Sequence, residues 1–308
     1  MIHVKNVSKH YGDLIAVDNI SFQLQKGDVL GFLGPNGAGK TTTMRIITGY
    51  MPPTKGSVYI ADKDVFEDPD EAKSYIGYLP ENPPLYEDMV VTDYLNFVAE
   101  IKNVPAAKKS SSIHYVMEKC GISEVSGRVI GHLSKGYRQR IGIAQALIND
   151  PAVLILDEPT NGLDPMQIIE IRELIKGLSS ERTVILSTHI LPEVTMICTK
   201  VAIINKGKLL VEESLERLAK SSGGKDSILL KTKHKGPDVK EKLLSLYNVE
   251  GVSDGPYEEF IVQPMMGFDI REELSQVVLQ NGWGLLEMRP VTHNLEEVFL
   301  RVISSEGN

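Results

Sequence analysis

A glycine-rich run near the start of the chain has the residue types and spacing of a phosphate-binding loop, G-x-x-x-x-G-K-[S/T]. It reads Gly34-Pro35-Asn36-Gly37-Ala38-Gly39-Lys40-Thr41. Apolar residues at 29–33 predict a strand before it and residues 41–47 a helix after it, so backbone N–H groups converge on one anion. Lys40 is then placed to reach the β- and γ-phosphates of a nucleoside triphosphate, and Thr41 to bind magnesium. The contacts predicted from this run are Gly34, Asn36, Gly37, Gly39, Lys40, Thr41 and Thr42.

A second group of candidate residues follows an unbroken apolar run at 151–156, which is typical of a parallel strand buried on both faces. The run ends in Asp157 and Glu158, and the carboxyl edge of a parallel sheet is where α/β folds place their chemistry. We expect Asp157 to hold magnesium through water and Glu158 to polarise the attacking water. The alternative is a solvated Asp-Glu turn on the surface. A further predicted strand at 183–188 brings His189 to the same edge, as a contact for the γ-phosphate.

Four motifs in a fixed order then carry a family resemblance over residues 1–210. The segment 133–140, Leu-Ser-Lys-Gly-Tyr-Arg-Gln-Arg, resembles the LSGGQ signature of ABC-type ATPases. It precedes Asp157 and Glu158, which stand at the position of the family's Walker B carboxylates. The segment 161–164, Asn-Gly-Leu-Asp, resembles the D-loop, and His189 falls at the switch-histidine position. Lys135 and Tyr137 depart from the family's pattern, which has Gly and Gln there. The resemblance implies a P-loop α/β fold that binds ATP with Mg²⁺ and hydrolyses it.

The signature also has a physical interpretation of its own. Ser134 is a suitable N-cap for a helix with apolar positions recurring at helical spacing, so its hydroxyl and the helix N-terminus can face an anion. These positions are Tyr137, Ile141, Ala144 and Ile148. In ABC ATPases the anion is the γ-phosphate held by the opposite subunit. The resemblance therefore implies a head-to-tail homodimer or heterodimer, with ATP between the phosphate loop of one copy and Ser134 and Gly136 of the other.

Two more residues acquire roles from the resemblance. Tyr11 matches the aromatic residue that stacks on adenine in this family, the alternative being a tyrosine that closes a strand turn. The segment 76–81 corresponds to the Q-loop, but Glu81 stands where glutamine is usual. Glu81 is accordingly a third candidate magnesium ligand beside Thr41 and Asp157, although its charge adds to that of Glu158.

Composition limits the classes of partner. Among 308 residues, 41 acidic and 33 basic side chains give a net charge of −8, which argues against nucleic acid as the main partner. The sequence has no apolar run of about 18 residues, the length that predicts a membrane span, and its first residues lack a signal-peptide core. We expect a cytoplasmic protein, peripheral on the inner face of the cell membrane. Cys120 and Cys198 are expected to be buried reduced thiols.

The order of predicted elements gives two domains. Residues 1–220 form the expected nucleotide-binding domain, with a helical subdomain at about 82–150. Within it Leu85, Tyr86 and Met89 are candidate contacts for a membrane subunit, or else they pack against the helix predicted at 92–102. Residues 225–308 are expected to form a small α+β, ferredoxin-like accessory domain with the order β-α-β-β-α-β and a final amphipathic helix at 295–302.

This C-terminal extension is similar to that of ABC-2-type exporter ATPases, and the signature and Q-loop segments look closest to the gliding-motility-associated branch. The resemblance implies an ATPase subunit that powers a separate integral-membrane permease. The alternative is a soluble ABC ATPase that remodels a ribosome or nucleic-acid complex. Members of that class carry two nucleotide domains, long heptad insertions or zinc-binding cysteines, and this sequence has none of these patterns.

Overall fold

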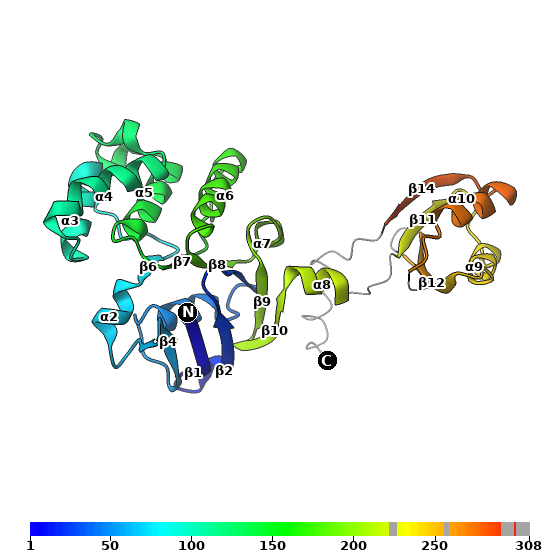
Figure 1. The fold of residues 1–308 in the computed structure, drawn as a ribbon, viewed down its shortest axis with the longest axis horizontal. Coiled ribbons are helices and arrows are strands. Elements are labelled where there is room, and N and C mark those ends of the chain that lie inside the picture. The colour runs from blue at the N-terminus through cyan, green and yellow to red at the C-terminus, as the bar shows by residue number, and fades with distance from the viewer. Residues whose placement is uncertain (222–226, 256–258, 266, 291–298, 300–308) are drawn as a thin grey trace. The chain divides into compact units, whose positions relative to one another are not determined.

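The computed structural model describes residues 1–221, 227–255, 259–265, 267–290 and 299. The chain divides into two compact units, Met1–Leu215 and Glu216–Asn308 (Figure 1). The division falls where the last strand of the first unit ends at Ser214, so helix α8 (Leu215–Ser221) falls almost wholly in the second unit.

The first unit contains two sheets. One is antiparallel, in the order β2-β1-β4-β5, and the other has six strands in the order β10-β9-β3-β8-β7-β6. In the second sheet β9, β3, β8, β7 and β6 run parallel, and β10 is antiparallel to β9. The strands are β1 (Ile2–Tyr11), β2 (Leu14–Leu24), β3 (Val29–Leu33), β4 (Lys55–Ile60), β5 (Lys63–Asp64), β6 (Ile76–Leu79), β7 (Val153–Asp157), β8 (Thr183–Thr188), β9 (Lys200–Asn205) and β10 (Lys208–Ser214).

One hydrophobic core joins the two sheets through helix α1 (Lys40–Ile47). Met44, Ile46 and Ile47 of α1 are fully buried in a cluster that also contains Phe22 of the antiparallel sheet and Phe32 of the parallel sheet. The two phenylalanine rings lie 5.8 Å apart. Because α1 directly follows the phosphate loop, this core fixes the position of the loop as well.

Three of the remaining helices of the first unit, within residues 91–147, group together in the part of the chain where a helical subdomain was expected, and the other three lie outside that range (Figure 1). Short 3₁₀ turns occur at Ser123–Val125 and Ile130–His132. Residues of the described part contain no helix that is long and apolar enough to cross a membrane. The helices are α2 (Pro69–Ser74), α3 (Val91–Ile101), α4 (Ala106–Lys119), α5 (Lys135–Leu147), α6 (Pro165–Ser179) and α7 (Leu191–Ile197).

Both cysteines of the chain lie in the first unit and are buried free thiols. Cys120 follows α4 and is fully buried, and burial raises the pKa of its thiol to about 12. Cys198 follows α7 and packs close to Gly31 of β3, and burial raises its pKa as well. The thiols are therefore protonated at neutral pH.

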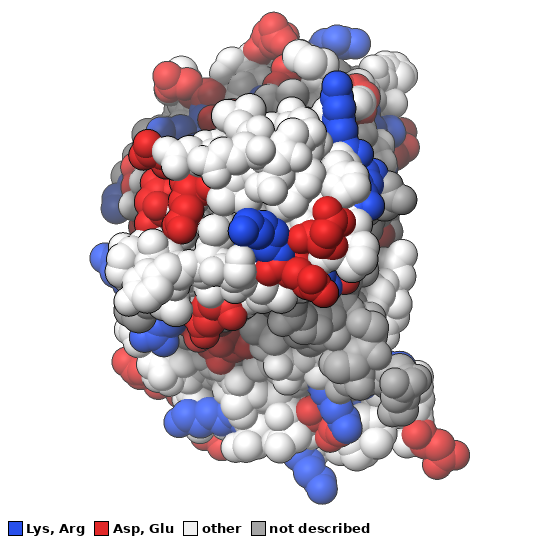
Figure 2. Space-filling model, turned by 90° about the vertical axis from the view of Figure 1, so that its right-hand side faces the viewer, with Lys and Arg blue, Asp and Glu red and all other residues white. Residues whose placement is uncertain are grey.

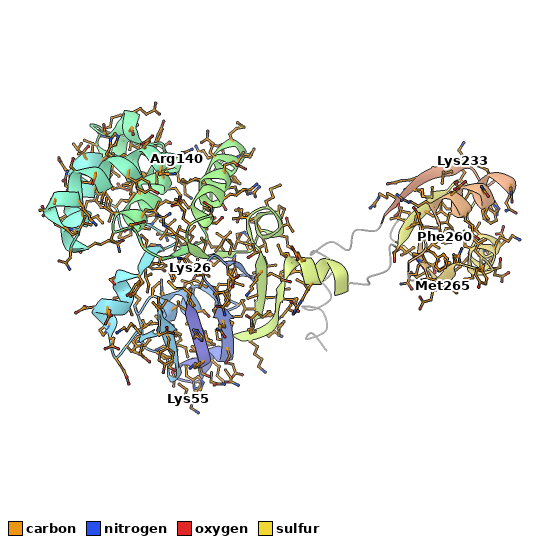
Figure 3. The ribbon with its side chains drawn as sticks, viewed as in Figure 1. Lys26, Lys55, Arg140, Lys233, Phe260 and Met265 are labelled. Carbon is orange, nitrogen blue, oxygen red and sulfur yellow. The ribbon has the colours of Figure 1, made fainter. Side chains whose placement is uncertain are left out.

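The second unit is an antiparallel sheet in the order β12-β13-β11-β14. After α8, its described elements follow one another as β-α-β-β-α-β, which is the order predicted for residues 225–308. Side chains from the two helices at 237–244 and 271–280 share a core with Phe260, which points into the unit in Figure 3. The helix predicted at 295–302 lies outside the described residues. The elements are β11 (Ile228–Thr232), α9 (Pro237–Leu244), β12 (Val249–Asp254), β13 (Phe260–Pro264), α10 (Arg271–Gln280) and β14 (Leu285–Pro290).

Charged side chains of both signs are interspersed on the face of the molecule shown in Figure 2. That face offers a mixed surface to a partner, unlike the continuous basic stripe that favours nucleic acid.

Candidate nucleotide-binding and catalytic site

Three neighbouring parallel strands bring the candidate residues together at one edge of the sheet. β3, β8 and β7 are adjacent, and each is buried along its whole length, which agrees with the mainly apolar sequences of these strands. At their carboxyl ends lie the phosphate loop, His189, and the pair Asp157 and Glu158. The edge therefore combines an anion-binding loop with two carboxylates and an imidazole.

The phosphate loop depends on glycine at two positions for different reasons. Gly39, immediately before α1, has φ +106°, and a Cβ atom built there would lie 2.6 Å from the carbonyl oxygen of Ala16. A Cβ atom on Gly34 would lie 2.3 Å from the carbonyl oxygen of Ile204. Neither contact can be relieved by a side-chain movement, because both involve backbone oxygen atoms. The glycines thus allow the loop to turn tightly against β9 and the start of β2.

Lys40 lies at the centre of the site. Its ammonium group donates hydrogen bonds to the carbonyl oxygens of Gly34 at 2.8 Å and Pro35 at 3.3 Å, and lies 3.2 Å from the Glu158 carboxylate. The other oxygen of Glu158 is 2.9 Å from Nδ1 of His189. Lys40 and Glu158 are buried, whereas His189 is exposed. Glu158 therefore connects a buried cation to an imidazole that faces solvent.

Glu158 has an unusual backbone conformation, with φ +49° in the left-handed region. Its N–H group donates to the backbone oxygen and the hydroxyl of Ser187, each at 3.1 Å. Strain of this kind persists where the surroundings hold the residue in place, and it is found at functional sites. Here it turns the chain sharply after β7, so that Glu158 points to the phosphate loop rather than continuing the strand.

Asp157 is fully buried at the end of β7. Its Oδ1 accepts a hydrogen bond from the Ser187 hydroxyl and another from Thr41 at 3.5 Å, while its Oδ2 has no hydrogen-bond partner. Burial raises the pKa of this carboxyl, and the two hydroxyl donors oppose the rise. A buried carboxylate oxygen without a partner, beside a threonine hydroxyl and a phosphate loop, fits a Mg²⁺ ion that also takes oxygen ligands from phosphates and water. The described residues contain no group of three or more His, Cys, Asp or Glu that could hold a metal alone.

A cavity of about 800 Å³ lies over these residues. It is lined by most of the side chains predicted to contact the nucleotide, and Tyr11 at its rim is 46% exposed. Leu14, Ile15, Ala16 and Lys206 also line it and have no counterpart among the predictions. The predicted residues in the lining are Tyr11, Asn36, Gly37, Gly39, Lys40, Thr41, Thr42, Glu81, Glu158 and His189.

Comparisons with known proteins agree with this geometry. Residues 17–161 match the family model described as "ABC transporter". The bacitracin transport ATP-binding protein BcrA of Bacillus licheniformis is 34% identical over 305 residues, which cover 98% of this chain and 97% of the relative. The chain belongs to the family of ABC transporter ATP-binding proteins.

Further relatives and solved structures extend the comparison. The lantibiotic transport ATP-binding protein SrtF of Streptococcus pyogenes is 38% identical and covers 70% of this chain and 92% of the relative. A structure of the ATP-binding subunit of an ABC transporter superposes with a TM-score of 0.66, 27% identity, and coverage of 72% and 93%. The dimeric, post-hydrolysis cassette MJ0796 bound to ADP and Pi superposes with a TM-score of 0.63, 25% identity, and coverage of 70% and 99%. The protein is thus an ABC ATPase, an ATP-binding subunit that acts with a separate permease.

The signature residues of this ABC ATPase do not line its own nucleotide cavity. Ser134 is the N-cap of α5, and its hydroxyl accepts a hydrogen bond from the Tyr137 N–H at 3.4 Å. Gly136 is packed so closely that an added Cβ would lie 2.7 Å from the Gln167 side chain. Ser134 is exposed, so its hydroxyl and the N-terminus of α5 can meet a ligand presented from outside the chain.

Several contacts of the site have no counterpart among the sequence predictions. Ser187 holds both Asp157 and the backbone of Glu158, and Glu81 accepts a hydrogen bond from Asn161 at 2.9 Å. Gln139 and Glu193 bind the residues that directly follow Glu158. For Ser187, Gln139 and Glu193 the available signal was a polar side chain that the fold buries, since buried polar side chains need partners.

A second cavity, of about 1030 Å³, lies between the ends of α1, α3 and α5 and the Q-loop region. Pro80, Asn82 and Pro84 line it, but Leu85, Tyr86 and Met89 do not. The Tyr86 ring instead packs at 5.4 Å on Phe97 and at 6.3 Å on Tyr94 of α3. Tyr86 therefore follows the alternative prediction, packing against the next helix.

Proposed function

We propose that this ABC ATPase powers an exporter of the ABC-2 type, peripheral on the inner face of the cell membrane. The likeness to the bacitracin transport protein over 98% of the chain supports this proposal, because it includes the C-terminal extension. On this proposal residues 1–220 are the nucleotide-binding domain, with its helical subdomain at 82–150, and residues 225–308 are an accessory domain. The cargo contacts the permease, and we propose that it resembles the bacitracin or lantibiotic of the relatives' names.

The placement of Glu158 between Lys40 and His189 is the observation that carries the catalytic part of the proposal. Glu158 accepts a proton from the attacking water, and His189 contacts the γ-phosphate. When ATP binds, the ammonium group of Lys40 exchanges its hydrogen bonds to the carbonyls of Gly34 and Pro35 for contacts with the β- and γ-phosphates. Magnesium, held by Thr41 and Asp157, supplies charge stabilisation for the phosphates when bound.

The adenine and the phosphates are bound from several sides in this proposal. Tyr11 stacks on the base from the rim of the cavity, next to the apolar side chains of Leu14 and Ile15. The backbone N–H groups of the phosphate loop surround the phosphates, and the N-terminus of α1 faces them.

Dimerisation completes the site in this proposal. Ser134 and Gly136 of one copy contact the γ-phosphate bound by the other, which agrees with their position away from their own cavity. The solved dimer of the MJ0796 cassette supports such a pairing. Hydrolysis then reopens the dimer.

The permease is proposed to insert a cytoplasmic segment into the 1030 Å³ cavity beside the Q-loop region. Both Pro80, one residue before Glu81, and the end of α5, which starts at the signature, line that cavity. A segment bound there touches the elements that lead to both halves of the nucleotide site. Closure of the dimer is thereby coupled to movement of the permease.

A pull-down from detergent-solubilised membranes tests this function. We expect the tagged chain to recover an integral-membrane permease, and the complex to release phosphate from ATP. Recovery of ribosomes or nucleic acid without a permease would favour the soluble alternative. If the complex that carries Glu158→Gln still releases phosphate at the wild-type rate, Glu158 is not the base in ATP hydrolysis.

A further inference from the structure

The three residues that follow Glu158 are each held by a side chain from a different part of the chain. Gln139 of α5 donates a hydrogen bond to the carbonyl oxygen of Pro159 at 2.7 Å. The Thr160 hydroxyl donates to the carboxylate of Glu193 on α7. Asn161 donates through its side-chain amide to Glu81 Oε1 at 2.9 Å. The segment thus receives one contact each from the signature helix, from the helix after His189 and from the Q-loop position.

The first two contacts are buried and form a fixed support. Gln139 is 5% exposed, Thr160 is 2% exposed and Glu193 is fully buried. Glu193 also accepts a hydrogen bond at 2.6 Å from Thr188, the residue before His189. Breaking either contact would leave a buried polar group without a partner, which makes both costly to lose.

Hydrogen bonds of a second side chain, Arg140, also hold the signature helix α5 in place. Arg140 of α5 donates to Glu170 of α6 at 2.7 Å and to the carbonyl oxygen of Cys120 at 2.9 Å, so it bridges α5 and α6 (Figure 3). The helices on both sides of the segment after Glu158 are therefore held independently of Glu81.

The third contact differs because both of its side chains are exposed and both line the nucleotide cavity. It acts at the far end of the turn that begins at Glu158, since the Asn161 N–H donates to the Glu158 carbonyl oxygen at 3.1 Å. The left-handed backbone of Glu158 belongs to this same turn. A contact that fixes Asn161 therefore restricts the direction in which the Glu158 side chain points.

We propose that Glu81 is a positioning residue for Glu158, and that it acts through its hydrogen bond to Asn161. This inference rests on the proposed role of Glu158 as the base in ATP hydrolysis. It gives Glu81 a function that needs no contact with the nucleotide. The glutamate transmits movement of the Q-loop region to the catalytic carboxylate.

A reversal of the hydrogen bond tests the proposal in the full chain. Asn161→Asp removes the donor and places two carboxylates opposite each other. Adding Glu81→Gln to that variant supplies a new amide donor and restores the contact with reversed polarity. The double variant Glu118→Gln with Asn161→Asp is the matched control, because it removes the same charge from the exposed face of α4 and leaves the contact broken.

We expect Asn161→Asp to lower kcat about tenfold and to change KM for ATP less than about twofold, as a positioning effect on the chemical step does. Glu81→Gln with Asn161→Asp should recover kcat at least about threefold over Asn161→Asp alone, and the matched control should recover none. Equal turnover of the two double variants would overturn the proposal. A normal kcat of Asn161→Asp would do the same.

Two further measurements distinguish this positioning role from magnesium binding and from a failure of the proposed function. If Glu81 acted as a magnesium ligand, the Mg²⁺ concentration for half-maximal phosphate release would shift in every Glu81→Gln variant, and the reversal would give no rescue. Urea unfolding of the same proteins measures the hydrogen bond without turnover, and zero coupling between positions 81 and 161 would also overturn the proposal. Wild-type turnover that is unaffected by Glu158→Gln would instead refute the proposed function.

Discussion

Replacing Glu158 by glutamine is the sharpest test of how this site hydrolyses ATP. The change keeps the size of the side chain and an oxygen that can face Lys40 and His189, but it removes the negative charge and the ability to accept a proton. A general base contributes about 10²–10⁴-fold to a rate, so its loss should raise the barrier for hydrolysis by about 3–5 kcal/mol. We expect kcat to fall by this factor.

The affinity for ATP should rise in Glu158→Gln although kcat falls. At 3.2 Å and an effective dielectric constant of about 20, the attraction between Lys40 and Glu158 has a gross value of about 5 kcal/mol, most of which desolvation offsets. Since ATP must draw Lys40 away from Glu158, the glutamine variant should bind ATP about threefold to tenfold more tightly.

Phosphate release and titration with a fluorescent ATP analogue measure the two effects separately. Glu118→Gln on α4 serves as the control for loss of one carboxylate, and both of its parameters should match the wild type. Turnover within about twofold of the wild type in Glu158→Gln would refute the reasoning, because a base on the reaction path cannot be removed at so small a cost. Loss of ATP binding would show that Glu158 mainly supports the fold of the loop.

Three further predictions concern the loop, the signature and a lysine. Gly39→Ala should abolish ATP binding measured by the same titration, since its backbone has φ +106° and its Cβ would meet the Ala16 carbonyl oxygen at 2.6 Å. Ser134→Ala should cost only about 1 kcal/mol in urea unfolding as a lost N-cap, yet greatly reduce ATP-dependent dimerisation in light scattering, while a normal dimer would contradict the proposed pairing. Burial lowers the pKa of Lys102 from its ordinary 10.5 to about 8. Between these pH values the folded state binds fewer protons than the unfolded state, so the free energy of unfolding rises with pH. Urea unfolding at several pH values should show this rise in the wild type and not in Lys102→Met.

Much of the nucleotide site was predictable because its elements carry local signals. The strand predicted at 183–188 is β8, and the helix predicted at 41–47 begins one residue earlier, at Lys40. Continuous apolar runs bounded by glycine or carboxylates suffice to place such strands at one edge of a parallel sheet. The cavity then gathers most of the predicted phosphate-loop residues together with Glu158 and His189, but not the signature residues.

The contacts between motifs were not predictable in the same way. Glu81 and Asn161 are separated by 80 positions, and no periodicity links them. The choice between two environments for Tyr86 also required the fold, because an exposed aromatic residue in a proline-containing loop suits a partner and a neighbouring helix equally well.

The two inaccessible, protonated thiols make this chain a convenient object for chemical labelling. Maleimide reagents attack thiolates, so neither Cys120 nor Cys198 should compete with a cysteine introduced on the surface. Spin labels or cross-linkers can therefore be attached at chosen sites without first replacing the native cysteines. Distances between the two copies of the proposed dimer, and their change through the ATP cycle, become measurable in the unaltered background.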